Sequence, residues 1–388
     1  MILREMADVL EVMATQYPIV TLLGPRQSGK TTLVQQCFPK KPYANVEEID
    51  TRELATQDPR GFLQQYPDGA IIDEIQRVPA LLSYLQSQVD QDKRKGLFIL
   101  TGSHQLQLKQ EVSQSLAGRT ALLYLLPLTL SELKTISPPP DINAQLISGF
   151  YPGVLVNQID PHIAYRNYFQ TYVERDLAQI IHVKDSANFQ RFMKLAAGRI
   201  GQLLNKNSLS GELGISSTTV EHWLSVLEAS HIIVRLSPYF ENFGKRIVKS
   251  QKIYFTDTGL AAYLLGIQDS KQMDRDPMRP YLFENLIFLE LMKTRYNQGY
   301  DHQLYFYRDH HQLEVDFIFQ AGHALIPIEV KSSKTVQMEF LRGVNSFMKL
   351  AENRCAKGFL IYAGKTTQSV NGCHIINYEQ TKSCVMPN

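Results

Sequence analysis

The sequence has few cysteines and no long apolar run, and both absences narrow the classes of protein to which it can belong. Its 388 residues include four cysteines, which form no CxxC pair and no metal-ligand spacing with the ten histidines, so neither a zinc module nor a disulfide framework is expected. No stretch reaches the roughly eighteen uninterrupted apolar residues of a membrane-spanning helix. The N-terminal MILREMADVLEVMATQYP carries acids within its apolar periodicity, which indicates an amphipathic helix and not an export signal. We therefore expect a cytoplasmic protein with no membrane partner.

A strong excess of one charge is also absent. The chain has 40 basic and 38 acidic residues and a formal net charge of +2. It is therefore not a polycation that binds nucleic acid or acidic membranes through its overall charge, and any such partner must meet a local patch. The length exceeds the size at which one hydrophobic core keeps growing, so several domains are expected.

Residues 19–135 alternate short apolar runs with helical stretches. The runs are IVTLLG, AIIDEI, LFILTGS and TALLYLLPL. Such alternation predicts a parallel sheet with helices on both faces. Three prolines, Pro138–Pro140, end this pattern, and a tyrosine-rich helical region follows over residues 141–185.

Residues 186–250 show a different pattern, in which three helical stretches precede two strand-like runs. The helical stretches are FQRFMKLAAGRIGQLLN, SLSGELG and STTVEHWLSVLEAS, and the runs are IIVRLSPY and RIVKSQKIYF. This order predicts a winged helix-turn-helix, and the alternative is a packing module between domains. The segment carries eight basic residues against four acids. Its candidate DNA contacts are Thr218, Thr219 and His222 on the recognition helix and Lys245, Arg246 and Lys249 in the wing.

The stretch GPRQSGKTT follows an apolar strand and precedes a helix, which is the context that a phosphate-binding loop of the form GxxxxGK[ST] requires. Glycines let backbone amides wrap the phosphates, Lys30 reaches the β and γ oxygens, Thr31 ligates magnesium, and the helix N-terminus adds a favourable dipole. We predict ATP and Mg²⁺ as cofactors. The predicted ATP-binding residues are Gly24, Pro25, Arg26, Gln27, Ser28, Gly29, Lys30, Thr31, Thr32, Asp73 and Ser103.

The run AIIDEIQ is an apolar strand that ends in two acids. Asp73 is predicted to hold the hydrated magnesium, and Glu74 to polarise the attacking water. The next strand ends in Thr101 and Ser103, either of which senses the γ-phosphate or is an ordinary polar strand terminus. Arg119, in LAGR, is either a surface arginine or a catalytic finger of the kind that AAA-type ATPases project into a neighbour's site, in which case a homo-oligomer is required.

The C-terminal part combines a helix, YLFENLIFLELMKTRY, with the strand candidates QLYFYR, LEVDFIFQ and ALIPIEVKSS, followed by another helix and GFLIYA. Glu284 lies on the helix, Asp316 on the second strand, and Glu329 and Lys331 on one face of the third. Carboxylates that converge repel each other unless a cation lies between them, so Glu284, Asp316 and Glu329 predict a Mg²⁺ or Mn²⁺ site, with Lys331 acting on the water. The alternative is a same-face ion pair of little consequence.

Over nearly all of its length, the chain resembles prokaryotic AAA-family P-loop ATPases fused to a C-terminal domain of unknown function with a restriction-endonuclease-like PD-(D/E)XK fold. The resemblance rests on LLGPRQSGKTTL, IIDEIQRVP, LTGSHQ, LAGR, YVERDL, KIYFTDTGL, FEN, EVDF and IEVKSS. It implies ATP hydrolysis at Lys30, Thr31, Asp73 and Glu74, and a metal site at the C-terminal acids. It confers no substrate.

We therefore predict a multidomain α/β protein. Its parts are a P-loop AAA-type ATPase domain with a parallel sheet (1–135), a helical connector (136–185), a winged helix-turn-helix (186–258) and a nuclease-like α/β domain (259–388). The predicted function is ATP-dependent action on DNA, in which nucleotide state controls DNA engagement and the last domain has metal-dependent cleavage as a further activity. The alternative is a non-cleaving switch that binds DNA or protein and uses the nuclease-like fold as a scaffold.

Overall fold

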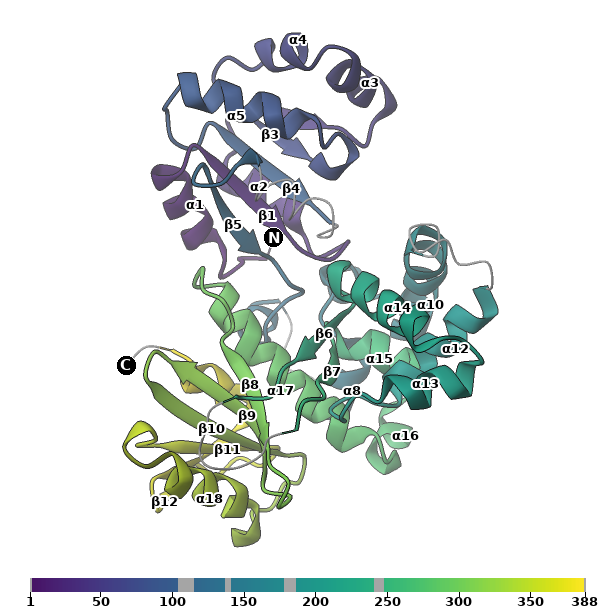
Figure 1. Cartoon of the computed structure of the whole chain (residues 1–388), viewed down its shortest axis with the longest axis vertical. Coiled ribbons are helices and arrows are strands. Elements are labelled where there is room, and N and C mark those ends of the chain that lie inside the picture. The colour runs from purple at the N-terminus through teal and green to yellow at the C-terminus, as the bar shows by residue number, and fades with distance from the viewer. Residues whose placement is uncertain (1, 104–114, 137–140, 178–185, 241–247, 387–388) are drawn as a thin grey trace. The chain divides into compact units, whose positions relative to one another are not determined.

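The computed structural model of the chain describes residues 2–103, 115–136, 141–177, 186–240 and 248–386 (Figure 1). The chain forms two compact units, of which the first comprises Met1–Leu128 with the short segments Ala229–His231 and Tyr296–Tyr300, and the second the remainder. The prolines Pro138–Pro140 and the predicted wing residues Lys245 and Arg246 lie outside the described residues. Within the described ranges, none of the helices combines the length and hydropathy needed to cross a membrane.

The first unit contains the predicted parallel sheet. Its strand order is β2-β3-β4-β1-β5, and each pair of neighbours is parallel. Four of its strands coincide with the apolar runs, and the short edge strand β2 was not predicted. The strands are β1 (Ile19–Leu23), β2 (Tyr43–Asn45), β3 (Ala70–Asp73), β4 (Phe98–Gly102) and β5 (Thr120–Tyr124).

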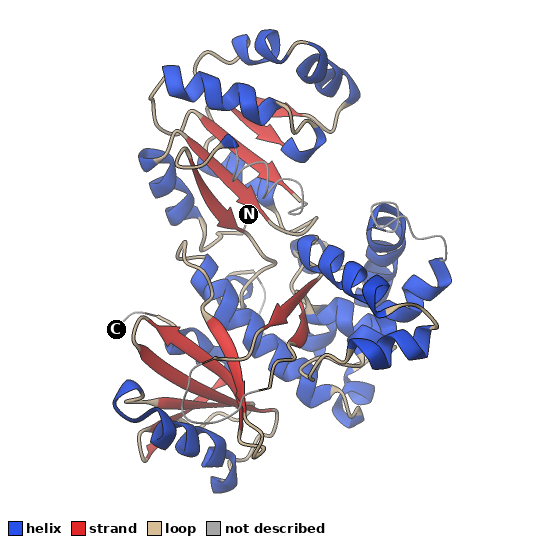
Figure 2. Ribbon diagram, in the orientation of Figure 1, coloured by secondary structure: helices blue, strands red, loops and turns tan. Residues whose placement is uncertain are grey.

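Helices cover both faces of this sheet, as predicted (Figure 2). Side chains alternate along β1, so Val20 and Leu22 pack in one apolar cluster with α1 and α2, while Ile19 and Leu23 pack in a second cluster with α3, α4 and α5. Burial on both sides explains why these strands read as continuous apolar runs. The helices are α1 (Ala7–Gln16), α2 (Lys30–Cys37), α3 (Ile49–Gln57), α4 (Pro59–Gln64) and α5 (Leu81–Gln91), with a 3-10 turn at Ile75–Arg77.

The second unit begins with helices. Tyrosines predicted to mark this region form part of its core, where the hydroxyls of Tyr151 and Tyr168 lie 3.0 Å apart. The helix α15 (Thr258–Leu265) packs against α8, α10 and α12 (Ser186–Ala197), so this helical region continues beyond residue 258. The first elements are α7 (Leu130–Leu133), α8 (Ile142–Ser148), α9 (Pro152–Val156), α10 (Pro161–Tyr168) and a π-helix (Phe169–Leu177).

The elements predicted over residues 186–250 occur in the predicted order, but the first helix ends at Ala197 and the second strand comprises only Lys252–Phe255. Three helices, α12 (Ser186–Ala197), α13 (Lys206–Leu213) and α14 (Ser217–Ala229), precede the antiparallel pair β6 (Ile233–Leu236) and β7 (Lys252–Phe255). Phe189 and Phe192 of α12 pack against Trp223 of α14, with ring centroids 5.4 and 5.2 Å from that of the tryptophan. The winged-helix classification itself stays a prediction.

The C-terminal part contains a six-stranded mixed sheet of order β12-β13-β11-β10-β9-β8. The antiparallel ladder of β9 and β10 ends where Phe317 lies opposite Ile328, so Asp316 and Glu329 are the next residues on the two strands. The strands β12 and β13 were not predicted. The elements are α16 (Ser270–Arg275), α17 (Arg279–Tyr296), β8 (Leu304–Arg308), β9 (Glu314–Ala321), β10 (Ala324–Lys331), a 3-10 turn (Met338–Leu341), α18 (Arg342–Ala351), a second turn (Glu352–Arg354), β11 (Gly358–Tyr362), β12 (Gln368–Val370), β13 (Cys373–Asn377) and a last 3-10 segment (Tyr378–Cys384).

Candidate functional site

The loop between β1 and α2 has a backbone that needs its glycines. Gly24 has a φ of +155°, and a Cβ there would lie 2.0 Å from the carbonyl oxygen of Leu125. Gly29, which precedes the first residue of α2, has a φ of +92°. Arg4, which is buried and lies just before α1, also supports the loop. Its guanidinium donates a hydrogen bond to the Ser28 carbonyl oxygen at 2.7 Å. Sequence reasoning missed this contribution, because nothing in the motif refers to the N-terminal residues.

Lys30 is buried inside this loop, at 5% exposure. Its Nζ donates to the carbonyl oxygens of Gly24 and Pro25 at 3.0 and 2.9 Å. Burial lowers the pKa of Lys30 to about 8, against the opposing effect of nearby Glu74 and Asp73. The hydroxyl of Ser28 is buried and has no hydrogen-bond partner in the described part of the chain. The buried Lys30 ammonium and the Ser28 hydroxyl, on a loop whose glycines have positive φ angles, are suited to bind the oxygens of a triphosphate.

Asp73 lies at the end of β3 and is almost fully buried. Its Oδ2 accepts from the hydroxyls of Thr31 at 2.8 Å and Tyr43 at 2.6 Å, and its Oδ1 accepts from Thr101. Thr31 and Asp73, the residues predicted to hold magnesium, are therefore in direct contact, and their oxygen atoms fit this hard cation. Tyr43 was missed because it lies on β2, whose three residues carry too little apolar signal to be recognised as a strand.

Glu74 adopts a left-handed backbone conformation, with φ +59° and ψ +42°. Such a conformation costs a residue with a side chain about 1–3 kcal/mol and is typical of functional sites. Ser103 donates to Glu74 Oε2 at 3.0 Å, and Gln76 donates to both Glu74 and Ser103. The structure thus brings Ser103 to the predicted catalytic carboxylate and adds Gln76, which the sequence reasoning did not single out.

Arg119 lies immediately before β5. Its guanidinium contacts Asp90 of α5 in a bidentate pair, with Nε and Nη2 at 2.6 and 2.9 Å from the two carboxylate oxygens. The arginine side chain is 31% exposed, so the pair lies at the surface. Its predicted role toward a neighbouring subunit stays a prediction.

The C-terminal acids lie where α17, β9 and β10 meet. Glu329 and Lys331 do share a face of β10, and Lys331 Nζ lies 2.6 Å from Glu329 Oε1. Asp316 Oδ2 accepts from the backbone amide of Val330 at 2.8 Å. Burial raises the pKa of Glu329 above its ordinary value, and Asp316 adds to this effect while Lys331 opposes it.

Strand β7 contributes two further side chains to these acids. Lys252 Nζ lies 2.9 Å from Glu314 Oε1 and 3.5 Å from Glu284 Oε1. The hydroxyl of Tyr254 donates to Glu284 Oε1 at 2.5 Å. We call these five residues, Lys252, Tyr254, Glu284, Glu314 and Asp316, the β7 cluster. The sequence reasoning missed its two β7 members, because it assigned them to the winged-helix segment, and it did not single out Glu314.

The arrangement does not fit a resident divalent cation. Among the described residues, no three His, Cys, Asp or Glu side chains converge closely enough to hold a metal ion. The negative charge is balanced instead by the ammonium groups of Lys252 and Lys331. Metal binding by Glu284, Asp316 and Glu329 therefore stays a prediction, and no chemical step is derived from it.

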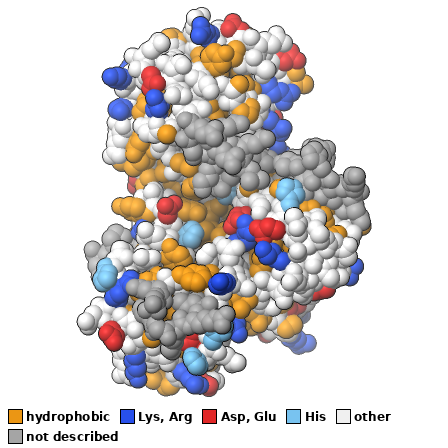
Figure 3. Space-filling view, viewed as in Figure 1, with side chains coloured by type: hydrophobic (Ala, Val, Ile, Leu, Met, Phe, Trp, Pro, Cys, Tyr) orange, Lys and Arg blue, Asp and Glu red, His pale blue; other side chains and the backbone are white. Residues whose placement is uncertain are grey.

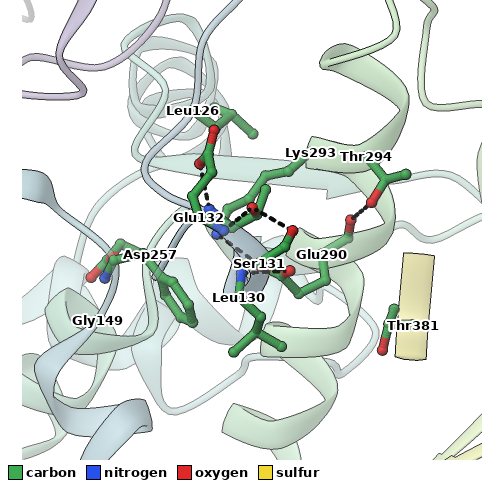
Figure 4. Close-up of polar contacts among 12 residues, drawn as sticks. Leu126, Leu130, Ser131, Glu132, Gly149, Asp257, Glu290, Lys293, Thr294 and Thr381 are labelled. Atoms are coloured by element: carbon green, nitrogen blue, oxygen red, sulfur yellow. Dashed lines mark hydrogen bonds and ion pairs between the residues drawn. The ribbon is translucent and has the colours of Figure 1, made fainter. Parts of the chain in front are cut away.

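A second polar cluster on α17 anchors the beginning of the second unit. Figure 4 shows Glu290 and Lys293 of α17 beside Leu130 of α7, whose backbone amide donates to Glu290 Oε2 at 2.9 Å. Lys293 Nζ lies 3.3 Å from Glu290 Oε1 and 4.0 Å from the ring centroid of Phe150. Burial raises the pKa of Glu290 and lowers that of Lys293. Each charge is buried with a partner, which is the arrangement expected of a structural ion pair.

The candidate DNA contacts Thr218, Thr219 and His222 lie at the beginning of α14. Ion pairs neutralise part of the basic excess of this segment. Arg199 pairs with Glu212, Lys206 with Glu221 at 3.0 Å, and Arg235 with Glu221 and Glu228, both at 2.6 Å. The charge available to a phosphate backbone is therefore smaller than the composition indicates.

Comparison with known proteins identifies the first part of the chain. Residues 16–134 match the family model described as an AAA domain. A protein of Mycobacterium tuberculosis described as uncharacterized is 30% identical over 366 residues, which cover 93% of this chain and 80% of that protein. The chain belongs to this family of AAA-domain proteins. Its AAA domain contains the loop, the acid pair and the strand-end residues described above.

The family models that match the rest of the chain do not indicate a function. Residues 139–271 and 281–381 match two family models described as domains of unknown function, DUF8612 and DUF4143. A protein of Haemophilus influenzae, also described as uncharacterized, is 24% identical over 314 residues, covering 72% of this chain and 75% of that protein. A Walker-type ATPase of Pyrococcus abyssi has a TM-score of 0.40 and 17% identity, covering 67% of this chain and 94% of that chain. A likeness this distant carries no argument about activity.

Proposed function

We propose that this protein hydrolyses ATP and that its nucleotide state controls its engagement with DNA. The observation that carries the ATPase part is the convergence of Lys30, the Thr31–Asp73 pair and the oriented Glu74 around one glycine-dependent loop. Magnesium, when bound with ATP, neutralises phosphate charge. The other contributions come from the chain itself.

In this mechanism, the Lys30 ammonium exchanges its two carbonyl partners for phosphate oxygens and stabilises the charge that develops on them. Ser103 and Gln76 hold the Glu74 carboxylate, so that it orients a water molecule and accepts its proton. The hydrogen bonds of Tyr43 and Thr101 fix the carboxylate plane of Asp73 beside Thr31.

DNA is the proposed partner of the segment over residues 186–258. Support comes from its three helices and antiparallel strand pair, and from the exposure of Thr218 and Lys249. On the described part of the face in Figure 3, basic side chains lie beside acidic ones. We therefore propose contact through a few side chains and the backbone of DNA, not through a broad basic surface.

Two candidate roles exist for the C-terminal part. The first is metal-dependent cleavage of DNA by Glu284, Asp316, Glu329 and Lys331. The second is a non-cleaving switch, in which the same fold is a scaffold for binding. The placement of Lys252 between Glu284 and Glu314 favours the second role for as long as this lysine stays in place.

Incubation with plasmid and short duplex DNA, in Mg²⁺ or Mn²⁺ and with or without ATP, separates these roles. Cleavage that is lost in Asp316→Ala and Lys331→Ala, but kept in the exposed controls Asp301→Ala and Lys365→Ala, supports the nuclease. Intact DNA, together with an ATP-sensitive shift of the duplex in a native gel, supports the switch. If the folded wild-type protein neither cuts nor shifts DNA under any of these conditions, the nuclease and a switch that binds DNA are both wrong.

A further inference from the structure

Lys252 is a buried lysine whose ammonium lies among carboxylates from a different part of the fold. It is 2% exposed and belongs to β7, which pairs with β6 and not with the C-terminal sheet. Its Nζ nevertheless lies 2.9 Å from Glu314 of β9 and 3.5 Å from Glu284 of α17. Lys252 and Tyr254 are two residues apart, so they leave β7 on the same side, toward these acids.

Specific contacts dock β7 in this position. The side chain of Asn285 on α17 forms two hydrogen bonds with the backbone of Phe255, each 2.8 Å long. The Phe255 amide donates to Asn285 Oδ1, and Asn285 Nδ2 donates to the Phe255 carbonyl oxygen. The backbone amide of Gly201 donates to the Ile253 carbonyl at 2.9 Å. A Cβ at Gly201 would lie 3.2 Å from Glu284 Oε1, so a glycine leaves room for this close approach. Hydrogen bonds to its backbone therefore hold β7 in place, and this position directs the Lys252 side chain toward the carboxylates of the β7 cluster.

The charges of the β7 cluster depend on each other. Burial disfavours the charged form of Lys252, but Glu284, Asp316 and Glu314 together outweigh it and raise the pKa of this lysine well above its ordinary value. Burial raises the pKa of Glu284, and Lys252 opposes this rise. A buried charge left without its partner is strongly destabilising, so the ammonium and the carboxylates stabilise each other.

A divalent cation at the same carboxylates would have to displace this ammonium. Lysine and a metal ion satisfy the same negative groups, and their positive charges repel each other at short distance. Among the described residues, the three carboxylates that the sequence pattern assigns to a metal, Glu284, Asp316 and Glu329, do not form a group that could hold a metal ion. The position of Lys252 beside Glu284 is consistent with an arrangement in which the lysine substitutes for the cation.

We propose that Lys252 is an autoinhibitory cation, which excludes divalent metal from the C-terminal carboxylates while β7 is docked. This inference rests on the proposed function, because it describes how the proposed C-terminal site is regulated. It makes metal binding conditional on the position of β7, a strand that belongs to the segment proposed to contact DNA. Release of β7, and not the supply of metal, is then the step that opens the site.

Titration with Mn²⁺ by calorimetry, without nucleotide or DNA, tests the inference. We expect Lys252→Met to gain one Mn²⁺ site with at least tenfold higher affinity than the wild type. The double variant Lys252→Met with Glu284→Gln should lose this site. The matched control is Lys293→Met, which removes another buried, carboxylate-paired lysine from outside the cluster and should gain no site. Equal Mn²⁺ binding by the wild type and Lys252→Met would overturn the inference.

Thermal unfolding gives a second readout, in which Lys252→Arg and Lys252→Met are compared with the wild type. Lys252→Arg keeps the positive charge, so it should unfold near the wild-type temperature and, like the wild type, gain no stability from Mn²⁺. Lys252→Met should unfold at a lower temperature and recover several degrees on addition of Mn²⁺. Mn²⁺ stabilisation of the wild type that disappears in Glu284→Gln would also overturn the inference. Metal binding confined to Lys252→Met, without DNA cleavage, would leave the inference standing and contradict only the nuclease role.

Discussion

Replacement of Lys30 by alanine should lower the rate of ATP hydrolysis at least about 100-fold, the loss typical when a preorganised charge-stabilising group is removed. The ammonium is buried, donates to two carbonyl oxygens of the loop, and lies near Glu74 and Asp73. Alanine supplies no charge for the phosphates and cannot reach them. Phosphate release under saturating ATP measures the effect.

The fold should survive this replacement. The two hydrogen bonds of Lys30 end on carbonyl oxygens of the same loop, and the sheet below it is held by apolar clusters on both faces. The exposed Lys40→Ala, a few residues beyond α2, is the matched control and should hydrolyse ATP at the wild-type rate. Lys30→Ala protein that keeps more than half of the wild-type rate would show that this loop is not the hydrolytic site.

Glu74→Gln should separate binding from hydrolysis. The amide keeps the size of the side chain but cannot accept a proton, so we expect hydrolysis to fall about 100-fold or more. ATP affinity should stay within about threefold, because the phosphate and magnesium contacts are assigned to Lys30, Thr31 and Asp73. Titration with a fluorescent ATP analogue measures the affinity, and single-turnover phosphate release measures the rate of hydrolysis.

The control for this variant is Glu53→Gln, an exposed carboxylate on α3 in the same domain. It should change neither affinity nor rate. A tenfold or greater loss of ATP affinity in Glu74→Gln would contradict the assigned division of roles, because it would place Glu74 in the binding set. Unchanged hydrolysis would remove it from the catalytic set.

The sequence predicted those parts of the nucleotide site that are local along the chain. The loop motif places Lys30 beside Thr31, and a strand ending in two acids places Asp73 and Glu74, because both signals are carried by adjacent residues. Tyr43 and Gln76 were not predicted, because their contributions depend on the three-dimensional fold. Tyr43 lies on a three-residue edge strand with one buried residue, and Gln76 acts through a turn whose geometry follows from the left-handed Glu74.

The C-terminal site was predicted less completely, because its chemistry depends on a distant residue. The order of Glu284, Asp316 and Glu329 follows from the helix and strand pattern, and β10 does place Glu329 and Lys331 on one face. No periodicity connects Lys252 to Glu284, 32 positions later, or to Glu314, 62 positions later. Only the docking of β7 on α17, fixed by Asn285, brings the lysine to these acids.

The family membership of the chain supports the ATPase domain and leaves the remaining two thirds without an assigned activity. The coupling of nucleotide state to a partner is therefore the central claim. Within the second unit, the backbone amide of Leu130 on α7 is held by Glu290 of α17, the helix that also carries Glu284. Nucleotide state controls a partner only if the ATP-bound and ADP-bound proteins differ in their affinity for it.

The most direct measurement is the affinity of the Glu74→Gln protein for a fluorescent duplex DNA, by anisotropy, with saturating ATP and with ADP. This variant holds ATP without turning it over, so each nucleotide state is stable during the titration. The account predicts dissociation constants that differ at least fivefold between the two states, and no such difference in Lys30→Ala. Equal affinities in ATP and ADP, or no DNA binding in either, would contradict it.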